Sequence, residues 1–154
     1  MKKIHMVDLQ TQYKFIKTNV DAGIEQVLNS AQFINGPAVK SFQKNLESYL
    51  GVKNVIPCAN GTDALQIAMM GLGLKPGDEV ITADFTYAST VEVIALLGLT
   101  PVLVDVDPIT FNINPESIEK AITKKTKAIV PVHLFGQVAQ MEKIMQIAKN
   151  MAFL

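Results

Sequence analysis

The spacing of hydrophobic residues changes near residue 51, and this change predicts two regions. From Thr11 to Ser30 the apolar residues recur at helical intervals, namely Ile16, Val20, Ile24, Val27 and Leu28. Gly36-Pro37 is typical of the start of a second helix, and Gly51 is suited to end it. Residues 1–50 are therefore predicted to form an amino-terminal helical segment.

After residue 51, short apolar runs alternate with helical runs. We predict strands at Val55–Pro57, Glu79–Ala83, Pro101–Val106 and Ala128–Val132. We predict helices at Thr62–Gly71, Tyr87–Leu97, Pro115–Ile122 and Met141–Asn150. Strands that are apolar throughout need helices on both faces, so the pattern predicts a three-layer α/β fold with a mostly parallel sheet. No linker divides the chain, and residues 1–154 are expected to form a single unit of which 51–154 is the sheet-containing part.

Composition excludes several classes of protein. The chain has 14 basic and 14 acidic residues, which argues against a nucleic-acid partner or a basic membrane-binding surface. Cys58 is the only cysteine, which excludes an internal disulfide and is typical of a reducing compartment. No signal peptide or membrane-length apolar run is present, so a cytoplasmic protein is expected.

The segment from Val55 to Leu65 contains the candidate binding site. It predicts a buried strand, a tight polar turn and the start of a helix, where Asn60 caps the helix and Gly61 lets the backbone approach a ligand. Thr62 adds a hydroxyl beside the first free N–H groups, so the turn is suited to a phosphate or a carboxylate. The alternative is a capping pair between Asn60 and Asp63 that binds no ligand, and the local pattern leaves both interpretations open.

A wider set of motifs resembles one family. The motifs are Ala59-Asn-Gly-Thr-Asp-Ala-Leu65, Gly77-Asp-Glu-Val-Ile-Thr82, Phe85-Thr-Tyr-Ala-Ser-Thr90, Pro101-Val-Leu-Val-Asp-Val-Asp107, Thr126-Lys-Ala-Ile-Val-Pro-Val-His133 and Phe135-Gly136. In order and spacing they resemble the DegT/DnrJ/EryC1/StrS sugar aminotransferases, which use pyridoxal 5′-phosphate (PLP) on the fold-type-I architecture. The resemblance runs from about Val7 to Asn150 and implies that residues 51–154 are the amino-terminal part of the PLP-binding large domain.

The resemblance also implies roles for individual residues. Gly61 and Thr62 match the pair that holds the cofactor phosphate, with Asn60 at the helix cap beside them. Tyr87 matches the aromatic residue that stacks on the pyridine ring, although a core position for this ring is the alternative. The Schiff-base lysine of the family lies beyond residue 154, so no catalytic residue is assigned here. The acid that pairs with the pyridine nitrogen is expected on the next strand, which Met151–Leu154 is expected to begin as part of a truncated fold.

The activity implied by the resemblance is transfer of an amino group from glutamate to a nucleotide-linked keto-sugar for polysaccharide or related glycan biosynthesis. Family members work as homodimers. Two alternatives remain: a PLP-dependent sugar dehydratase of the same family, and a non-catalytic fragment or interaction protein that keeps the fold.

Other polar residues are interpreted as structural. A lone histidine after a strand, His133, is more often structural than ligand-binding. Asp105 and Asp107 are expected to be turn and cap residues rather than metal ligands, and no metal site is predicted. The basic run Lys124, Lys125 and Lys127 is interpreted as a solvated surface turn.

Overall fold

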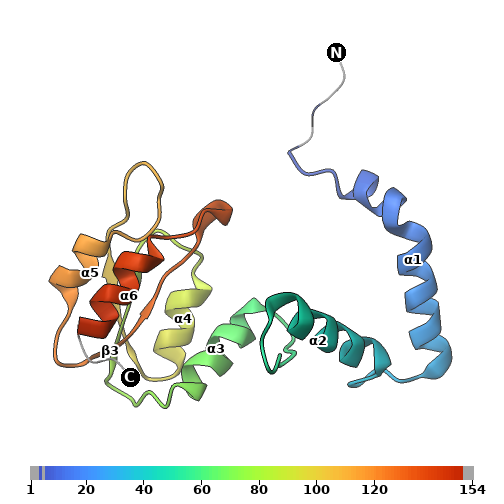
Figure 1. The fold of residues 1–154 in the computed structure, drawn as a ribbon, viewed down its shortest axis with the longest axis horizontal. Coiled ribbons are helices and arrows are strands. Elements are labelled where there is room, and N and C mark those ends of the chain that lie inside the picture. The colour runs from blue at the N-terminus through green and yellow to red at the C-terminus, as the bar shows by residue number, and fades with distance from the viewer. Residues whose placement is uncertain (1–3, 5, 151–154) are drawn as a thin grey trace. The chain divides into compact units, whose positions relative to one another are not determined.

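The computed structural model describes residue 4 and residues 6–150, and the chain divides into two units, Met1–Pro57 and Cys58–Leu154. The predicted strand at Met151–Leu154 lies outside the described residues. Figure 1 shows the first unit in blue and teal and the second from green to red. Each unit is described by itself.

The amino-terminal unit consists of two helices, α1 (Leu9–Ser30) and α2 (Pro37–Leu50). Asp8 caps α1 by accepting a hydrogen bond from the Thr11 N–H at 3.0 Å. Gly36 precedes α2, Pro37 occupies its first turn, and Gly51 ends it in the left-handed conformation at φ 65°. Both predicted helices are confirmed, and neither contains a buried residue among those that the structure describes.

The predicted strand at Val55–Pro57 is wrong. The Val55 N–H donates to Glu47 Oε1 at 3.1 Å, and Gln43 Nε2 donates to the Val55 carbonyl at 2.7 Å. These side chains of α2 take the place of a neighbouring strand, because they satisfy the backbone groups that a sheet would otherwise pair. The segment therefore lies in the amino-terminal unit as an extended connection.

The carboxyl-terminal unit contains a parallel sheet. Its strands are β1 (Glu79–Ala83), β2 (Thr100–Val104) and β3 (Thr126–Val130), in the spatial order β2-β1-β3. Ile81 of the central strand lies opposite Val102 on one side and Ile129 on the other. The helices of this unit are α3 (Gly61–Gly71), α4 (Ser89–Leu96), α5 (Pro115–Ala121) and α6 (Met141–Asn150), with a short 3₁₀ turn, η1, at Leu134–Gly136. The α/β class and the parallel sheet are confirmed.

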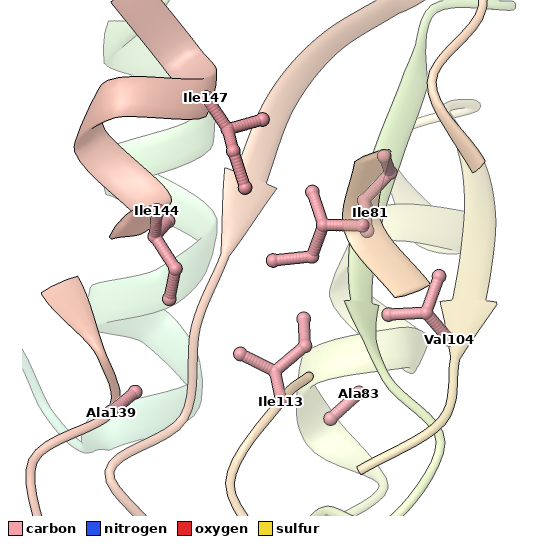
Figure 2. Packing of buried hydrophobic residues seen from close by; sticks show 8 residues of the cluster. Ile81, Ala83, Val104, Ile113, Ala139, Ile144 and Ile147 are labelled. Carbon is pink, nitrogen blue, oxygen red and sulfur yellow. The ribbon is translucent and has the colours of Figure 1, made fainter. Parts of the chain in front are cut away.

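The two faces of the sheet carry separate cores. Val80 joins Met69 of α3 and Val93 of α4 in one buried cluster. Ile81 points to the opposite face and joins a cluster with Ile118 of α5 and residues of α6. Figure 2 shows seven labelled residues of this second cluster, which come from β1, β2, α6 and the connections before α5 and α6: Ile81, Ala83, Val104, Ile113, Ala139, Ile144 and Ile147. Alternate residues of β1 thus serve opposite layers, as a sheet covered on both faces requires.

Candidate functional site

The start of α3 combines a closed cap with open backbone donors. Asn60 Oδ1 accepts a hydrogen bond from the Asp63 N–H at 2.9 Å, and Asn60 Nδ2 donates to Asp63 Oδ2 at 3.1 Å. The capping pair anticipated from the sequence is therefore present, and it turns the Asp63 carboxylate toward Asn60. The Asn60 carbonyl accepts from the Ala64 N–H at 3.1 Å.

The pair does not use all the donors of this helix end. Within the described part of the chain, the N–H groups of Gly61 and Thr62 and the Thr62 hydroxyl have no protein hydrogen-bond partner, and both residues are exposed. The positive end of the helix dipole lies at the same place. Capping and anion binding are thus compatible here, because the cap occupies Asp63 N–H and leaves the first two N–H groups to solvent or a ligand.

Among the residues that the structure describes, no contact requires residue 61 to be glycine. A Cβ built on Gly61 meets no heavy atom within 4 Å, and its φ lies outside the left-handed region. Gly36 is different, because a Cβ there would lie 2.4 Å from the Gln32 carbonyl oxygen. A ligand that approaches the backbone closely is one reason for a glycine at a position where the protein itself leaves room.

Tyr87 lies after β1 and just before α4, and 81% of its surface is exposed. The alternative that this ring fills the core is therefore not supported. Phe85 does not fill the core either: it is half exposed and packs on Phe111, with the ring centroids 5.5 Å apart. Tyr87 follows the carboxyl end of the central strand. Because α3 and α4 pack together on one face of the sheet and each is followed by a strand, their first turns lie toward that same edge.

His133 and the two aspartates serve structural roles. His133 Nδ1 accepts a hydrogen bond from the Ala139 N–H at 3.2 Å. Asp105 Oδ1 accepts from the Val106 N–H, and Asp107 Oδ1 accepts from Thr110 and Ile109. The backbone N–H of Thr110, then that of Ile109, then the Thr110 hydroxyl hold the pKa of Asp107 below its ordinary value of 3.8. The interpretation as a turn residue is confirmed for Asp107, whereas the Asp105 carboxylate bonds to the N–H of the adjacent Val106.

No cluster of three metal-ligand side chains is found among residue 4 and residues 6–150.

Lys124, Lys125 and Lys127 are exposed, as expected, and lie at the amino end of β3. They are therefore at the sheet edge opposite to the one that Tyr87 follows. Across the described helices, none is both long and apolar enough to span a bilayer.

A polar cleft of about 570 Å³ opens between α5 and α6. Its lining includes Asp107, Glu116, Glu119 and Lys143. These helices cover the face of the sheet opposite to α3 and α4. The cleft contains none of the residues that the sequence assigned to cofactor binding, so we do not connect it with the start of α3.

Sequence reasoning missed Asn112. This residue is 3% exposed, and its side chain bonds to two backbone groups of the connection after β3. Asparagine in a loop is ordinary turn chemistry, and its partners are 22 and 25 positions away. No local signal in the sequence distinguishes it from a surface turn residue.

Known proteins are similar to this chain both in sequence and in fold. UDP-2-acetamido-2-deoxy-3-oxo-D-glucuronate aminotransferase from Pseudomonas aeruginosa is 52% identical over 147 residues, which are 96% of this chain and 41% of that protein. A DegT DnrJ EryC1 StrS aminotransferase from Brucella abortus has a TM-score of 0.91 and 44% identity, covering 96% of this chain and 42% of its own. NtdA from Bacillus subtilis, solved with bound cofactor PMP, has a TM-score of 0.91 and 36% identity, covering 97% and 35% respectively.

The fold is that of an α/β protein with a parallel sheet, and the similar solved structures are aminotransferases. The profile of the DegT/DnrJ/EryC1/StrS aminotransferase family matches residues 14–153, and the chain belongs to that family. The chain spans about two fifths of the length of the relatives that it matches, 41% for the Pseudomonas aeruginosa protein. The resemblance stated from the motifs is thereby confirmed.

Proposed function

We propose that this chain supplies the phosphate-binding part of a PLP-dependent aminotransferase that acts on a nucleotide-linked keto-sugar. Residues 51–154 form the amino-terminal part of its large domain, glutamate is the amino donor, and the assembled enzyme is a homodimer. The observation that carries the proposal is the start of α3, where the N–H groups of Gly61 and Thr62 are open while Asn60 and Asp63 satisfy each other.

The residues present fit a phosphorylated aromatic cofactor. The Gly61 and Thr62 N–H groups and the Thr62 hydroxyl would hold the phosphate at the positive end of α3. Asn60 orders the turn by capping, and the exposed Tyr87 ring offers a flat surface for a pyridine ring. Bound PLP supplies the aldehyde that carries an amino group between substrates. The contribution of this chain to that chemistry is to bind the phosphate, to fix the tilt of the ring and to exclude water from one of its faces.

The substrate class rests on the relatives. The Pseudomonas aeruginosa protein is an aminotransferase of a UDP-linked 3-oxo sugar, and it shares 52% identity with this chain. That identity supports a sugar nucleotide as the amino acceptor. We assign no covalent role to Lys124, Lys125 or Lys127, because they lie at the amino edge of the sheet, whereas the cofactor residues lie toward its carboxyl edge.

Binding measurements with PLP and pyridoxal test the proposal. We expect PLP to bind in equilibrium dialysis and pyridoxal, which lacks the phosphate, to bind far more weakly. Thr62→Ala removes a hydrogen bond to a charged group, which is worth about 1.5–3 kcal/mol, so the dissociation constant for PLP should rise by roughly 10- to 100-fold.

Thr18→Ala is the matched control, because Thr18 is an exposed helical threonine of the amino-terminal unit. It should leave PLP binding unchanged. Equal binding of PLP and pyridoxal, or an unchanged dissociation constant for PLP in Thr62→Ala, would refute the phosphate site. Absence of any PLP binding would favour a non-catalytic role.

A further inference from the structure

Asn112 joins two loops at the carboxyl edge of the sheet. It lies in the connection between β2 and α5, and only 3% of its surface is exposed. Its Oδ1 accepts a hydrogen bond from the Leu134 N–H at 3.0 Å, and its Nδ2 donates to the Gln137 carbonyl at 3.1 Å. The amide therefore closes both ends of η1, which spans Leu134–Gly136. A buried side-chain amide that forms both of its hydrogen bonds holds the two loops in a fixed arrangement, because breaking either bond leaves a buried polar group unsatisfied.

The loop that carries Asn112 is itself held firmly. Asp107 accepts hydrogen bonds from the backbone of Ile109 and Thr110, and the Asp107 N–H donates to the Asn112 carbonyl at 2.9 Å. Val106 pairs with Ile113 in an antiparallel bridge. Ile113, next to Asn112, and Ala139, just beyond the second loop, are buried in the same core cluster (Figure 2). Both loops are thus anchored in one core.

The preceding residue, Phe111, connects the Asn112 contact with the loop after β1. Its φ is 58°, in the left-handed region that a bulky residue rarely adopts. It packs its ring on Phe85, which lies two residues before Tyr87. Phe111 and Asn112 thus link the loop after β2 to the loops after both other strands, β1 and β3.

Phe135 lies in the middle of η1, between the two residues that bond to Asn112. Its φ is 53°, again left-handed, and the residue is 85% exposed. A strained backbone that persists in a loop needs surrounding contacts that over-determine it, and such residues cluster at functional sites. Here those contacts are the two Asn112 bonds and the bond from the Ala139 N–H to His133 Nδ1. The left-handed backbone thus coincides with an aromatic side chain that the described residues leave exposed.

The strands are parallel, so the loops after β1, β2 and β3 leave the same edge of the sheet. Figure 1 shows the connection after β2 and the turn after β3 projecting from the same end of this unit. Tyr87 belongs to this edge, and the first turn of α3 lies toward it. Ligands of parallel α/β sheets bind at this edge.

We propose that Asn112 is a positioning residue whose side-chain amide fixes the loop His133–Gln137 so that Phe135 faces the cofactor site at the carboxyl edge of the sheet. The inference rests on the proposed function for the identity of the ligand. It adds the loop after β3 to the cofactor site that the start of α3 and the Tyr87 ring form in the proposed function. Asn112 acts through the loop and does not touch the ligand.

Amide-resolved NMR of the ¹⁵N-labelled chain, titrated with PLP, tests this inference. In the unaltered chain we expect PLP to shift the amides of Gly61 and Thr62 and also those of Leu134–Gly136. Asn112→Ala should raise the exchange rate of the Leu134 amide by about tenfold, which corresponds to a lost hydrogen bond of about 1.4 kcal/mol. It should also abolish the PLP-induced shifts at 134–136 while those at Gly61 and Thr62 persist.

Asn114→Ala is the matched control. Asn114 Oδ1 accepts from the Glu116 N–H at 2.8 Å and caps α5, so its loss weakens a neighbouring element without touching the loop after β3. It should leave the shifts and the Leu134 exchange rate unchanged. If Asn112→Ala does not fold, Asn112→Asp keeps the volume and the acceptor for Leu134 but cannot donate to Gln137. The Gln137 end should then loosen alone.

The outcomes separate the two proposals. No PLP-induced shift at Gly61 and Thr62 refutes the proposed function, and the exchange comparison then decides the role of Asn112 by itself. Shifts at Gly61 and Thr62 without shifts at Leu134–Gly136 overturn the placement of Phe135. Equal Leu134 exchange in Asn112→Ala and Asn114→Ala overturns the positioning role.

Discussion

Gly61→Ala should separate folding stability from ligand binding. The φ of Gly61 lies outside the left-handed region, and an added Cβ would meet no heavy atom within 4 Å. Alanine in a compatible conformation restricts the unfolded chain more than glycine does. We therefore expect the free energy of unfolding to rise by about 0.4–1 kcal/mol.

Phosphate binding should change in the opposite direction. A phosphate oxygen that accepts from the N–H of residue 61 lies at a donor–acceptor distance of about 2.9 Å, which leaves little room for a neighbouring methyl group. A loss of about 1.4 kcal/mol of binding free energy raises the dissociation constant for PLP about tenfold. Higher stability together with weaker binding is the expected signature of a glycine that serves a ligand.

Urea unfolding and equilibrium dialysis measure the two quantities. Gly71→Ala is the control at the other end of α3, where an added Cβ also meets no heavy atom within 4 Å. It should stabilise the chain similarly without weakening PLP binding. Gly36→Ala should destabilise, because its Cβ would lie 2.4 Å from the Gln32 carbonyl oxygen. Unchanged PLP affinity in Gly61→Ala would refute the reasoning, as would an equal loss of affinity in Gly71→Ala.

Two further predictions concern the loop after β2 and the core. The backbone N–H groups of Thr110 and Ile109 lower the pKa of Asp107 from 3.8, so its stabilisation of the loop is present above that pH and is lost as pH falls through the lowered folded value. The protection of the Ile109 and Thr110 amides, measured relative to their intrinsic exchange rates at each pH, should accordingly fall in acid in the unaltered chain, whereas in Asp107→Asn this protection should not change with the titration of residue 107. Ile81→Ala should cost about 2–5 kcal/mol in urea unfolding, because Ile81 is fully buried in the central strand. Ile109→Ala, at an 85% exposed position, should cost less than about 0.5 kcal/mol, and equal costs would contradict the assigned core.

The helices and the parallel strands could be predicted because their signals are local. Periodic apolar residues, the Gly36-Pro37 pair and the turn at Asn60 located the elements, and Glu79–Ala83 and Met141–Asn150 have the predicted bounds. The strand after β1 ends at Val104 rather than at Val106, since Val106 pairs with Ile113. The predicted strand at Val55–Pro57 was wrong, because an apolar run indicates an extended backbone but not its hydrogen-bond partner. Side chains of α2, rather than a neighbouring strand, bond to the backbone N–H and carbonyl of Val55.

The candidate site was predictable to the same extent. The cap formed by Asn60 and the open donors beside it follow from four adjacent residues, so the sequence alone indicates them. The assignment of Tyr87 came from the family resemblance. Its 81% exposure is compatible with stacking, but the stacking itself stays a prediction.

The role of Asn112 could not be predicted, because its hydrogen-bond partners are far away in the sequence. It lies 22 positions before Leu134, yet its amide bonds there at 3.0 Å because β2 and β3 flank the same central strand. The crossovers that make the sheet parallel also bring the loop after β2 to the loop after β3 at one edge. Asn112 is buried there between Phe111 and Ile113, and the adjacent residues give no signal of its distant hydrogen-bond partners. In this chain the loops after β2 and β3 are held together by the Asn112 side chain, and its burial is the observation that locates this contact.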